Sequence, residues 1–287
     1  MNPLGVHALV WVGDWSEPSA RHALRSTAET GFDLIEVPVL DPDSIDIPMT
    51  RALLEEHGLH ATCSLGLTFD ADISSADDVV ARRGQERLEA ALGVARGIGA
   101  SYLGGVIYSA LGKYGEPATA AGRSNCVAGL RELARRAADD DITLGLEVVN
   151  RYESNVLNVA DQALEMLADI GEDNVVLHLD TYHMAIEEQD LETPVVQSAD
   201  HLGYVHVGES HRGYLGTGTI DFVPFFGALR RIGYTGPITF ESFSSAVVSE
   251  ELSNTLAVWR NLWNDSTDLA TQARDFVRTH LAAHHPA

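Results

Sequence analysis

Short apolar runs alternate along the whole chain with longer segments of helical period, several of which end at a glycine. The apolar runs predict eight β-strands, at residues 5–11, 33–39, 60–67, 101–109, 142–150, 175–180, 203–207 and 237–241. The segments between them predict helices at residues 18–30, 48–57, 77–99, 118–140, 159–170 and 222–232. A less regular helical stretch covers residues 187–199, and a last helical region runs from residue 249 to the C-terminus with a break near residues 265 and 266.

This strict alternation of strand and helix indicates an α/β fold with a parallel sheet, and eight units favour closure into a (β/α)8 TIM barrel. An open, doubly wound sheet is the alternative fold. It is disfavoured because no G-x-G-x-x-G turn follows the first strand. No linker, low-complexity tract or change of composition divides the chain, so residues 1–287 are expected to form a single domain.

Charge narrows the range of partners. The chain carries 19 Lys and Arg against 42 Asp and Glu, a formal charge of −23. Such a chain repels phosphate backbones and anionic membranes, so neither nucleic acid nor a membrane is expected as a partner. The same balance favours a neutral substrate over a strongly anionic one.

Cysteine usage and the N-terminus predict a cytoplasmic protein. Cys63 and Cys126 are too few for a disulfide framework and lie in no metal-binding motif. The first residues contain no basic region and no long apolar run of the kind found in a signal peptide. No apolar stretch reaches the roughly 20 residues that a membrane-spanning helix requires.

One potential metal ligand stands at or near the end of each of the last four predicted strands. These residues are Glu147, Asp180, His206 and Glu241. The carboxyl ends of barrel strands converge on one face, so the four side chains are expected to meet there. An oxygen-rich set with a single imidazole suits Mn²⁺, Mg²⁺ or Co²⁺ better than Zn²⁺. The pattern therefore predicts one divalent cation per subunit.

Three further polar residues follow these strand ends within three to six positions, in predicted loops: Glu153, His183 and Arg212. Arginine and histidine donate hydrogen bonds to hydroxyl groups, and glutamate accepts them. These residues are therefore candidates for orienting a bound substrate.

With these residues in place, the chain resembles the ketose 3-epimerases, also called D-tagatose, D-psicose or D-allulose 3-epimerases, among the xylose-isomerase-like barrels. The resemblance covers essentially the whole chain. Its most specific segments are LEVVNRYE (146–153), LDTYHM (179–184), HVGESHR (206–212) and FESF (240–243). The segment GYLGTG (213–218) is most similar to the actinobacterial D-allulose 3-epimerases.

The resemblance implies a role for each matching residue. It implies that Glu147, Asp180, His206 and Glu241 hold the cation, and that the sugar is contacted by Glu153, His183, Arg212, His7, Gly66, Phe243 and Trp15. It also implies a homodimer or homotetramer. Two positions depart from the family. Ala185 stands where family members commonly have asparagine, and Leu111 stands in the segment after the fourth strand where several members have a tryptophan. These departures bear on substrate preference and turnover, not on the type of reaction.

The implied reaction is C3 epimerisation of free ketoses such as D-fructose and D-allulose, through a cis-enediolate. The proton on carbon 3 is acidic because it lies α to a carbonyl group, and a divalent cation stabilises the charge that develops on its removal. Glu147 and Glu241 are the candidate catalytic residues, one removing the proton and the other returning one to the opposite face. Three alternatives remain open: an aldose–ketose isomerase of the same superfamily, an endonuclease-IV-like DNA repair nuclease, and a non-catalytic sugar-binding barrel.

Overall fold

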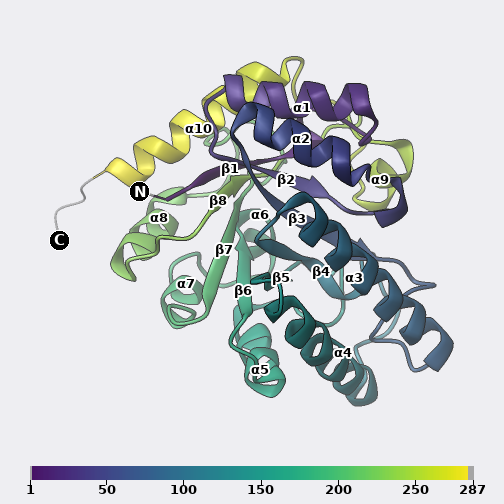
Figure 1. The fold of residues 1–287 in the computed structure, drawn as a ribbon. Coiled ribbons are helices and arrows are strands. Elements are labelled where there is room, and N and C mark those ends of the chain that lie inside the picture. The colour runs from purple at the N-terminus through teal and green to yellow at the C-terminus, as the bar shows by residue number, and fades with distance from the viewer. Residues whose placement is uncertain (1, 284–287) are drawn as a thin grey trace.

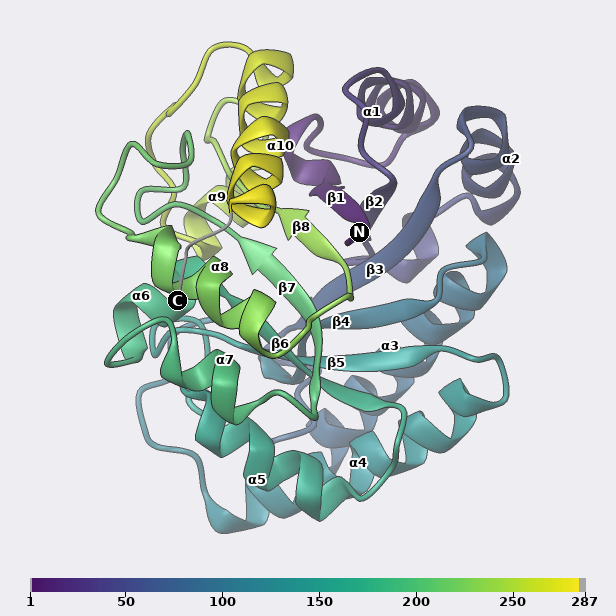
Figure 2. The same cartoon turned by 90° about the vertical axis from the view of Figure 1, so that its left-hand side faces the viewer.

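The computed structural model describes residues 2–283, and in this part of the chain eight parallel strands close into one barrel (Figures 1 and 2). The strands are β1 (Leu4–His7), β2 (Leu34–Pro38), β3 (His60–Leu67), β4 (Tyr102–Ala110), β5 (Thr143–Val148), β6 (Val175–Asp180), β7 (Leu202–Val207) and β8 (Ile238–Phe240). Closure is direct, because β1 pairs with β8 as well as with β2. The predicted (β/α)8 barrel is confirmed.

Helices surround the barrel on its outside (Figure 2). They are α1 (Glu17–Glu29), α2 (Ile47–His57), α3 (Asp78–Ile98), α4 (Ala120–Ala138), α5 (Ala160–Ile170), α6 (Thr181–Glu187), α7 (Thr193–Gln197), α8 (Phe222–Arg231), α9 (Glu250–Thr255) and α10 (Ser266–Ala282). The apolar faces of most of these helices pack on the strands in one large core, whereas Leu252 of α9 packs in a separate small cluster with Leu9, Phe243 and Val248. None of the helices within residues 2–283 is long and apolar enough to cross a bilayer.

The structure corrects two predicted elements. The strand predicted to reach Trp11 ends at His7, because the His7 imidazole accepts a hydrogen bond from the backbone N–H of Leu9 and starts the 3-10 helix Ala8–Val10. The irregular helix predicted over residues 187–199 is in fact only the short α7, and the predicted stretch overlaps α6 at its last residue, Glu187. Asp180 caps α6 by accepting from the N–H of Tyr182, so that helix begins directly at the strand end.

The C-terminal helical region is broken earlier than the sequence predicts. Residues 256–265 separate α9 from α10, and the Asp265 side chain caps α10 by accepting from the N–H groups of Thr267 and Asp268. The remainder of the predicted helix, beyond residue 283, lies outside the described residues.

A polar and aromatic layer fills the barrel interior beneath the strand ends. The rings of Tyr102 and Tyr204 stack with their centroids 4.2 Å apart. Glycines on the neighbouring strands make room for them, since a Cβ on Gly145 would lie 1.7 Å from the Tyr102 hydroxyl. Close packing of this kind tolerates little added volume.

We therefore expect Gly145→Ala to lower the free energy of unfolding by about 1–3 kcal/mol, the usual cost of overpacking a core. Urea denaturation measures the change. Tyr102→Phe removes the clashing oxygen and is expected to recover part of the loss in the double variant. Gly93→Ala is the matched control: no heavy atom lies within 4 Å of the added Cβ, so it is expected to stabilise α3 by about 0.5–1 kcal/mol. Equal effects of the two alanine substitutions would contradict this account.

Candidate metal centre and substrate pocket

The four predicted metal ligands converge at the carboxyl ends of the last four strands. Glu147 and His206 are the penultimate residues of β5 and β7, Asp180 ends β6, and Glu241 directly follows β8. The register of the sheet brings Asp180 opposite His206. One ligand atom from each of the four side chains lies within 4.8 Å of the others, and all four residues are buried. The sequence-predicted set is thus brought together in space.

The chemistry of this cluster fits a divalent cation. His206 Nδ1 is buried and has no hydrogen-bond partner among the described residues. It lies 3.3 Å from a carboxylate oxygen of Glu147 and 3.5 Å from one of Glu241. Ligand atoms on an ion with bonds of about 2.0–2.2 Å stand at comparable separations. Three carboxylates and one imidazole form a donor set suited to Mn²⁺, Mg²⁺ or Co²⁺.

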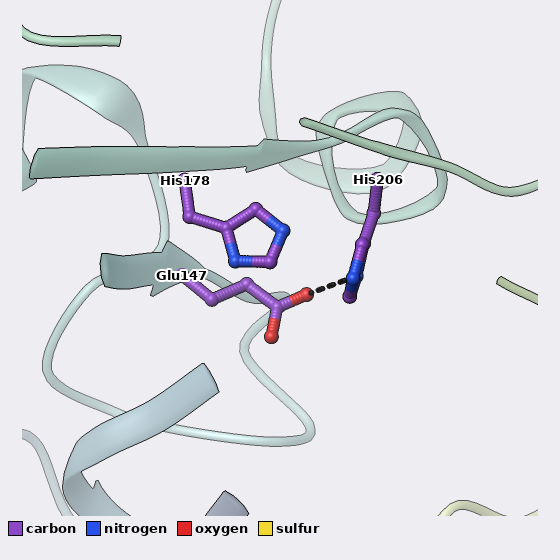
Figure 3. A group of neighbouring side chains, drawn as sticks. All are labelled: Glu147, His178 and His206. Carbon is purple, nitrogen blue, oxygen red and sulfur yellow. Dashed lines mark ion pairs between the residues drawn. The ribbon is translucent and has the colours of Figure 1, made fainter. Parts of the chain in front are cut away.

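A third side chain, His178, lies beside Glu147 and His206 (Figure 3). It stands on β6, two residues before Asp180, and so points to the same side of the strand. Its Nδ1 lies 3.1 Å from the Tyr102 hydroxyl, and its ring packs edge-on against that of His206 with centroids 4.2 Å apart. Because these three residues share two members with the four-ligand cluster, they belong to the same centre.

The two glutamates of the cluster have different environments. Burial raises the pKa of Glu147 well above its usual value, and the neighbouring carboxylates of Glu241 and Asp180 add to this effect. Burial also acts to raise the pKa of Glu241, but His206 and Arg212 outweigh it and lower that pKa. Arg212 donates to Glu241 at 2.6 Å. One carboxyl group therefore holds a proton more readily than the other.

A pocket opens over this cluster at the end of the barrel. Its lining includes six residues implied to contact a sugar: His7, Gly66, Glu153, His183, Arg212 and Phe243. It also includes Glu147, His206 and Glu241, whereas Asp180 is fully buried and is not part of the lining. The predicted substrate-binding residues and metal ligands thus share one cavity.

Trp15 is the exception. Its indole N–H donates to the Thr50 hydroxyl at 2.9 Å, and the residue does not line the pocket. A contact between Trp15 and the substrate stays a prediction that the lining of this pocket does not support. The chain turns into a 3-10 helix after His7, and this leads Trp15 away from the barrel axis toward α2.

Local hydrogen bonds fix the state of His183. The backbone N–H of Asn150 can only donate, and it donates to His183 Nδ1 at 3.1 Å. Burial lowers the pKa of His183 well below its usual value, so the ring is neutral and its proton resides on Nε2. That nitrogen lies 3.9 Å from carboxylate oxygens of Glu147 and Glu153, where it can donate to a ligand. His183 lies in the first turn of α6, not in a loop as predicted.

Arg212 occupies a strained position in the loop after β7. Its φ is +61°, a left-handed conformation that is uncommon for residues with a side chain. The guanidinium lies 3.7 Å from the ring centroid of Tyr182 and 5.0 Å from that of Phe243. The Ser242 hydroxyl also donates to the Arg212 carbonyl oxygen. These contacts hold the buried, positively charged guanidinium of Arg212 beside the carboxylates of the cluster.

Position 66 has no room for a side chain, because Leu111 lies directly beside it. A Cβ at this position would lie 2.6 Å from the Cβ of Leu111, which also lines the pocket. Leu111, one of the two positions predicted to depart from the family, therefore packs directly against Gly66 in the pocket wall.

Several residues of the site were not identified from the sequence, namely Glu36, Asn150, His178 and Tyr182. Glu36 did carry a signal, because it is the only charged side chain within the apolar run LIEVP of β2. His178 stands at period-two spacing from Asp180, which also marks it as facing inward. Asn150 and Tyr182 act through contacts that no sequence spacing indicates.

Comparison with known proteins agrees with this site. The profile of the family described as xylose isomerase-like TIM barrel matches residues 24–278. An L-ribulose 3-epimerase from Methylomonas sp. (strain DH-1) is 53% identical over 274 residues, 96% of each chain. A ketose 3-epimerase from Arthrobacter globiformis is 51% identical over 280 residues, 98% of this chain and 97% of that protein.

Solved structures give the same picture. The crystal structure of a D-allulose 3-epimerase from Methylomonas sp. in complex with D-allulose superposes with a TM-score of 0.96 at 52% identity, over 97% of both chains. The chain therefore belongs to the xylose isomerase-like TIM barrel family, and within it to the ketose 3-epimerases. The resemblance found in the sequence is confirmed.

Proposed function

We propose that this chain forms a single barrel domain and is an isomerase. The reaction is the metal-dependent epimerisation of free ketoses at carbon 3. The observation that carries the proposal is the arrangement of Glu147 and Glu241. Both contribute to one four-ligand cluster and both line the same pocket. Relatives of about 50% identity are named for this reaction.

Glu147, Asp180, His206 and Glu241 would hold one divalent cation per subunit, Mn²⁺, Mg²⁺ or Co²⁺. When bound, the cation supplies Lewis-acid stabilisation of negative charge on the sugar oxygens next to carbon 3. The Nδ1 lone pair of His206 and the three carboxylates provide its ligands. Arg212 supplies the positive charge that keeps Asp180 and Glu241 close together, at 3.3 Å and 2.6 Å from its Nη1.

Proton transfer is assigned to the two glutamates. Glu147 lies on β5 and Glu241 directly follows β8, so the two carboxyl groups can approach carbon 3 from different sides of a bound sugar. Glu241 removes the carbon 3 proton in one direction, and Glu147 delivers a proton to the other face. The roles exchange in the reverse reaction. A carbon 3 proton is weakly acidic, so a fixed base beside it is needed for turnover.

Substrate orientation is assigned to the remaining pocket residues. His183 Nε2–H and the Arg212 guanidinium donate to sugar oxygens, and Glu153 accepts from a hydroxyl. Asn150 holds Glu153 and His183 together, since its side-chain amide lies 2.8 Å from the Glu153 carboxylate and 2.9 Å from His183 Nδ1. His7, Gly66 and Phe243 form the walls. Fixing carbons 1 to 3 in this way places one C–H bond between the bases.

Incubation with D-fructose in D₂O tests the reaction. We expect a new ketohexose carrying deuterium at carbon 3, seen by chromatography and NMR, because the proton exchanges with solvent between removal and return. A panel of free ketoses, including D-allulose, D-tagatose and L-ribulose, ranks substrate preference. An aldose product labelled at carbon 2 or carbon 1 would instead establish an aldose–ketose isomerase.

The remaining predictions of partners have separate tests. We propose a homodimer or homotetramer, to be measured by light scattering in solution. The formal charge of −23 disfavours the DNA repair nuclease, and we expect no nicking of abasic DNA. Ketose binding with no turnover under any cation would favour the sugar-binding barrel.

A further inference from the structure

Glu36 is a fully buried carboxylate beside the metal centre, and it belongs to the lining of the same pocket. It stands on β2, on the opposite side of the barrel from β6, and it is not one of the four clustered ligands. An ionised group in an apolar interior is costly unless it is paired and hydrogen-bonded. Glu36 therefore depends on the polar groups around it.

A chain of hydroxyl groups leads to Glu36. The Thr62 and Thr239 hydroxyls lie 2.8 Å and 2.7 Å from the hydroxyl of Tyr204, which in turn donates to Glu36 Oε2 at 2.8 Å. Tyr204 has only one hydroxyl proton and gives it to the carboxylate, so the two threonines must donate to Tyr204. The network is thus ordered from β3, β7 and β8 into a single acceptor.

The second bond to the same oxygen comes from the metal centre. His206 Nε2 lies 2.8 Å from Glu36 Oε2. A carboxylate that already accepts from Tyr204 offers only lone pairs, so His206 must carry its proton on Nε2. The other ring nitrogen, Nδ1, is then left facing Glu147 and Glu241 with no other partner. The other oxygen, Oε1, faces His7 Nε2 at 3.6 Å.

We infer that Glu36 is the positioning residue of the metal centre. It sets which nitrogen of His206 carries the proton and fixes the plane of the ring, so that Nδ1 presents its lone pair to the cation. This inference rests on the proposed function for the presence of a cation. Carboxylate groups behind metal-bound histidines typically change metal affinity by about 10- to 100-fold when they are altered.

The test is Glu36→Gln, which preserves the size of the side chain but removes the charge and adds a competing N–H donor. We expect Mn²⁺ to bind about 10- to 100-fold more weakly, measured from the electron paramagnetic resonance signal of free Mn²⁺. Circular dichroism and the melting temperature of the metal-free protein are expected to match wild type.

Tyr204→Phe is the matched control, because it removes the other bond to Oε2 while leaving the carboxylate against His206. We expect it to change Mn²⁺ affinity less than threefold.

A second measurement needs no variant. In the Mg²⁺-bound wild type, ¹⁵N NMR of the histidine rings is expected to show the proton of His206 on Nε2. A proton on Nδ1, or Mn²⁺ affinity in a folded Glu36→Gln within twofold of wild type, would overturn the inference. Failure of the wild type to bind Mn²⁺ would instead contradict the proposed function, so the two failures are distinguishable.

Discussion

Replacing Glu147 or Glu241 with glutamine is expected to abolish epimerisation, with a loss in kcat of at least about 10²- to 10⁴-fold for each variant. The amide has nearly the same size as the carboxyl group, but it can neither remove nor deliver a proton. Conversion of D-fructose, followed by chromatography, measures the loss. Exchange of the carbon 3 proton with D₂O reports proton removal even where no product accumulates.

The exchange experiment separates the two roles. A variant that still exchanges the carbon 3 proton of one epimer, but no longer interconverts the two, has kept the base on one face and lost the partner on the other. Glu55→Gln on α2 is the matched control, since that side chain is 70% exposed and does not line the pocket. We expect it to behave as wild type. Normal turnover in either Glu147→Gln or Glu241→Gln would refute the assignment.

Removing the cation is expected to have the second largest effect. Glu147, Asp180 and Glu241 are buried together, and the nearby Arg212 and His206 offset part of their negative charge. A cation that binds only the folded chain, at 100 times its Kd, adds about 2.7 kcal/mol to the free energy of unfolding. For a chain of this size that corresponds to a rise of about 4–5 °C in Tm. Chelation is expected to reverse this rise and to eliminate activity.

Thermal unfolding with chelator, followed by addition of Mn²⁺, Mg²⁺ or Co²⁺, measures this effect and ranks the three cations. In Asp180→Asn the cation-dependent rise in Tm is expected to disappear, while the metal-free protein remains folded. Asp161→Asn, an exposed carboxylate in the first turn of α5, provides the control and is expected to keep the full rise. A rise of the same size in both variants would place the cation elsewhere.

The sequence was sufficient to predict the architecture because the barrel depends on periodicity. Each strand is an apolar run, and each helix has an apolar face that packs on the strands and shields them from water. Both patterns can be recognised in the sequence. The errors lie where a side chain ends an element. His7 and Asp180 both cap a helix immediately after a strand. In the sequence, a polar residue that caps a helix looks the same as a polar residue that only ends a strand.

The same distinction applies to the site. Glu147, Asp180, His206 and Glu241 were predictable because they occupy equivalent places on successive strands. Contacts across the barrel interior have no such regularity. The bond between Glu36 and His206 joins residues 170 positions apart, on strands that are not neighbours in the sheet. Only the closed shape of the sheet brings them together.

Closure also determines when the site comes into existence. The first and last strands meet at the pairing of Leu4 with Ile238, and His7 and Glu241 stand on the two sides of that seam. A chain that has ordered its first seven strands but not the eighth lacks a ligand and leaves the pocket open on one flank. The full four-ligand set therefore requires the pairing of β1 with β8, and stopped-flow mixing with Mn²⁺ is expected to report when that pairing has formed.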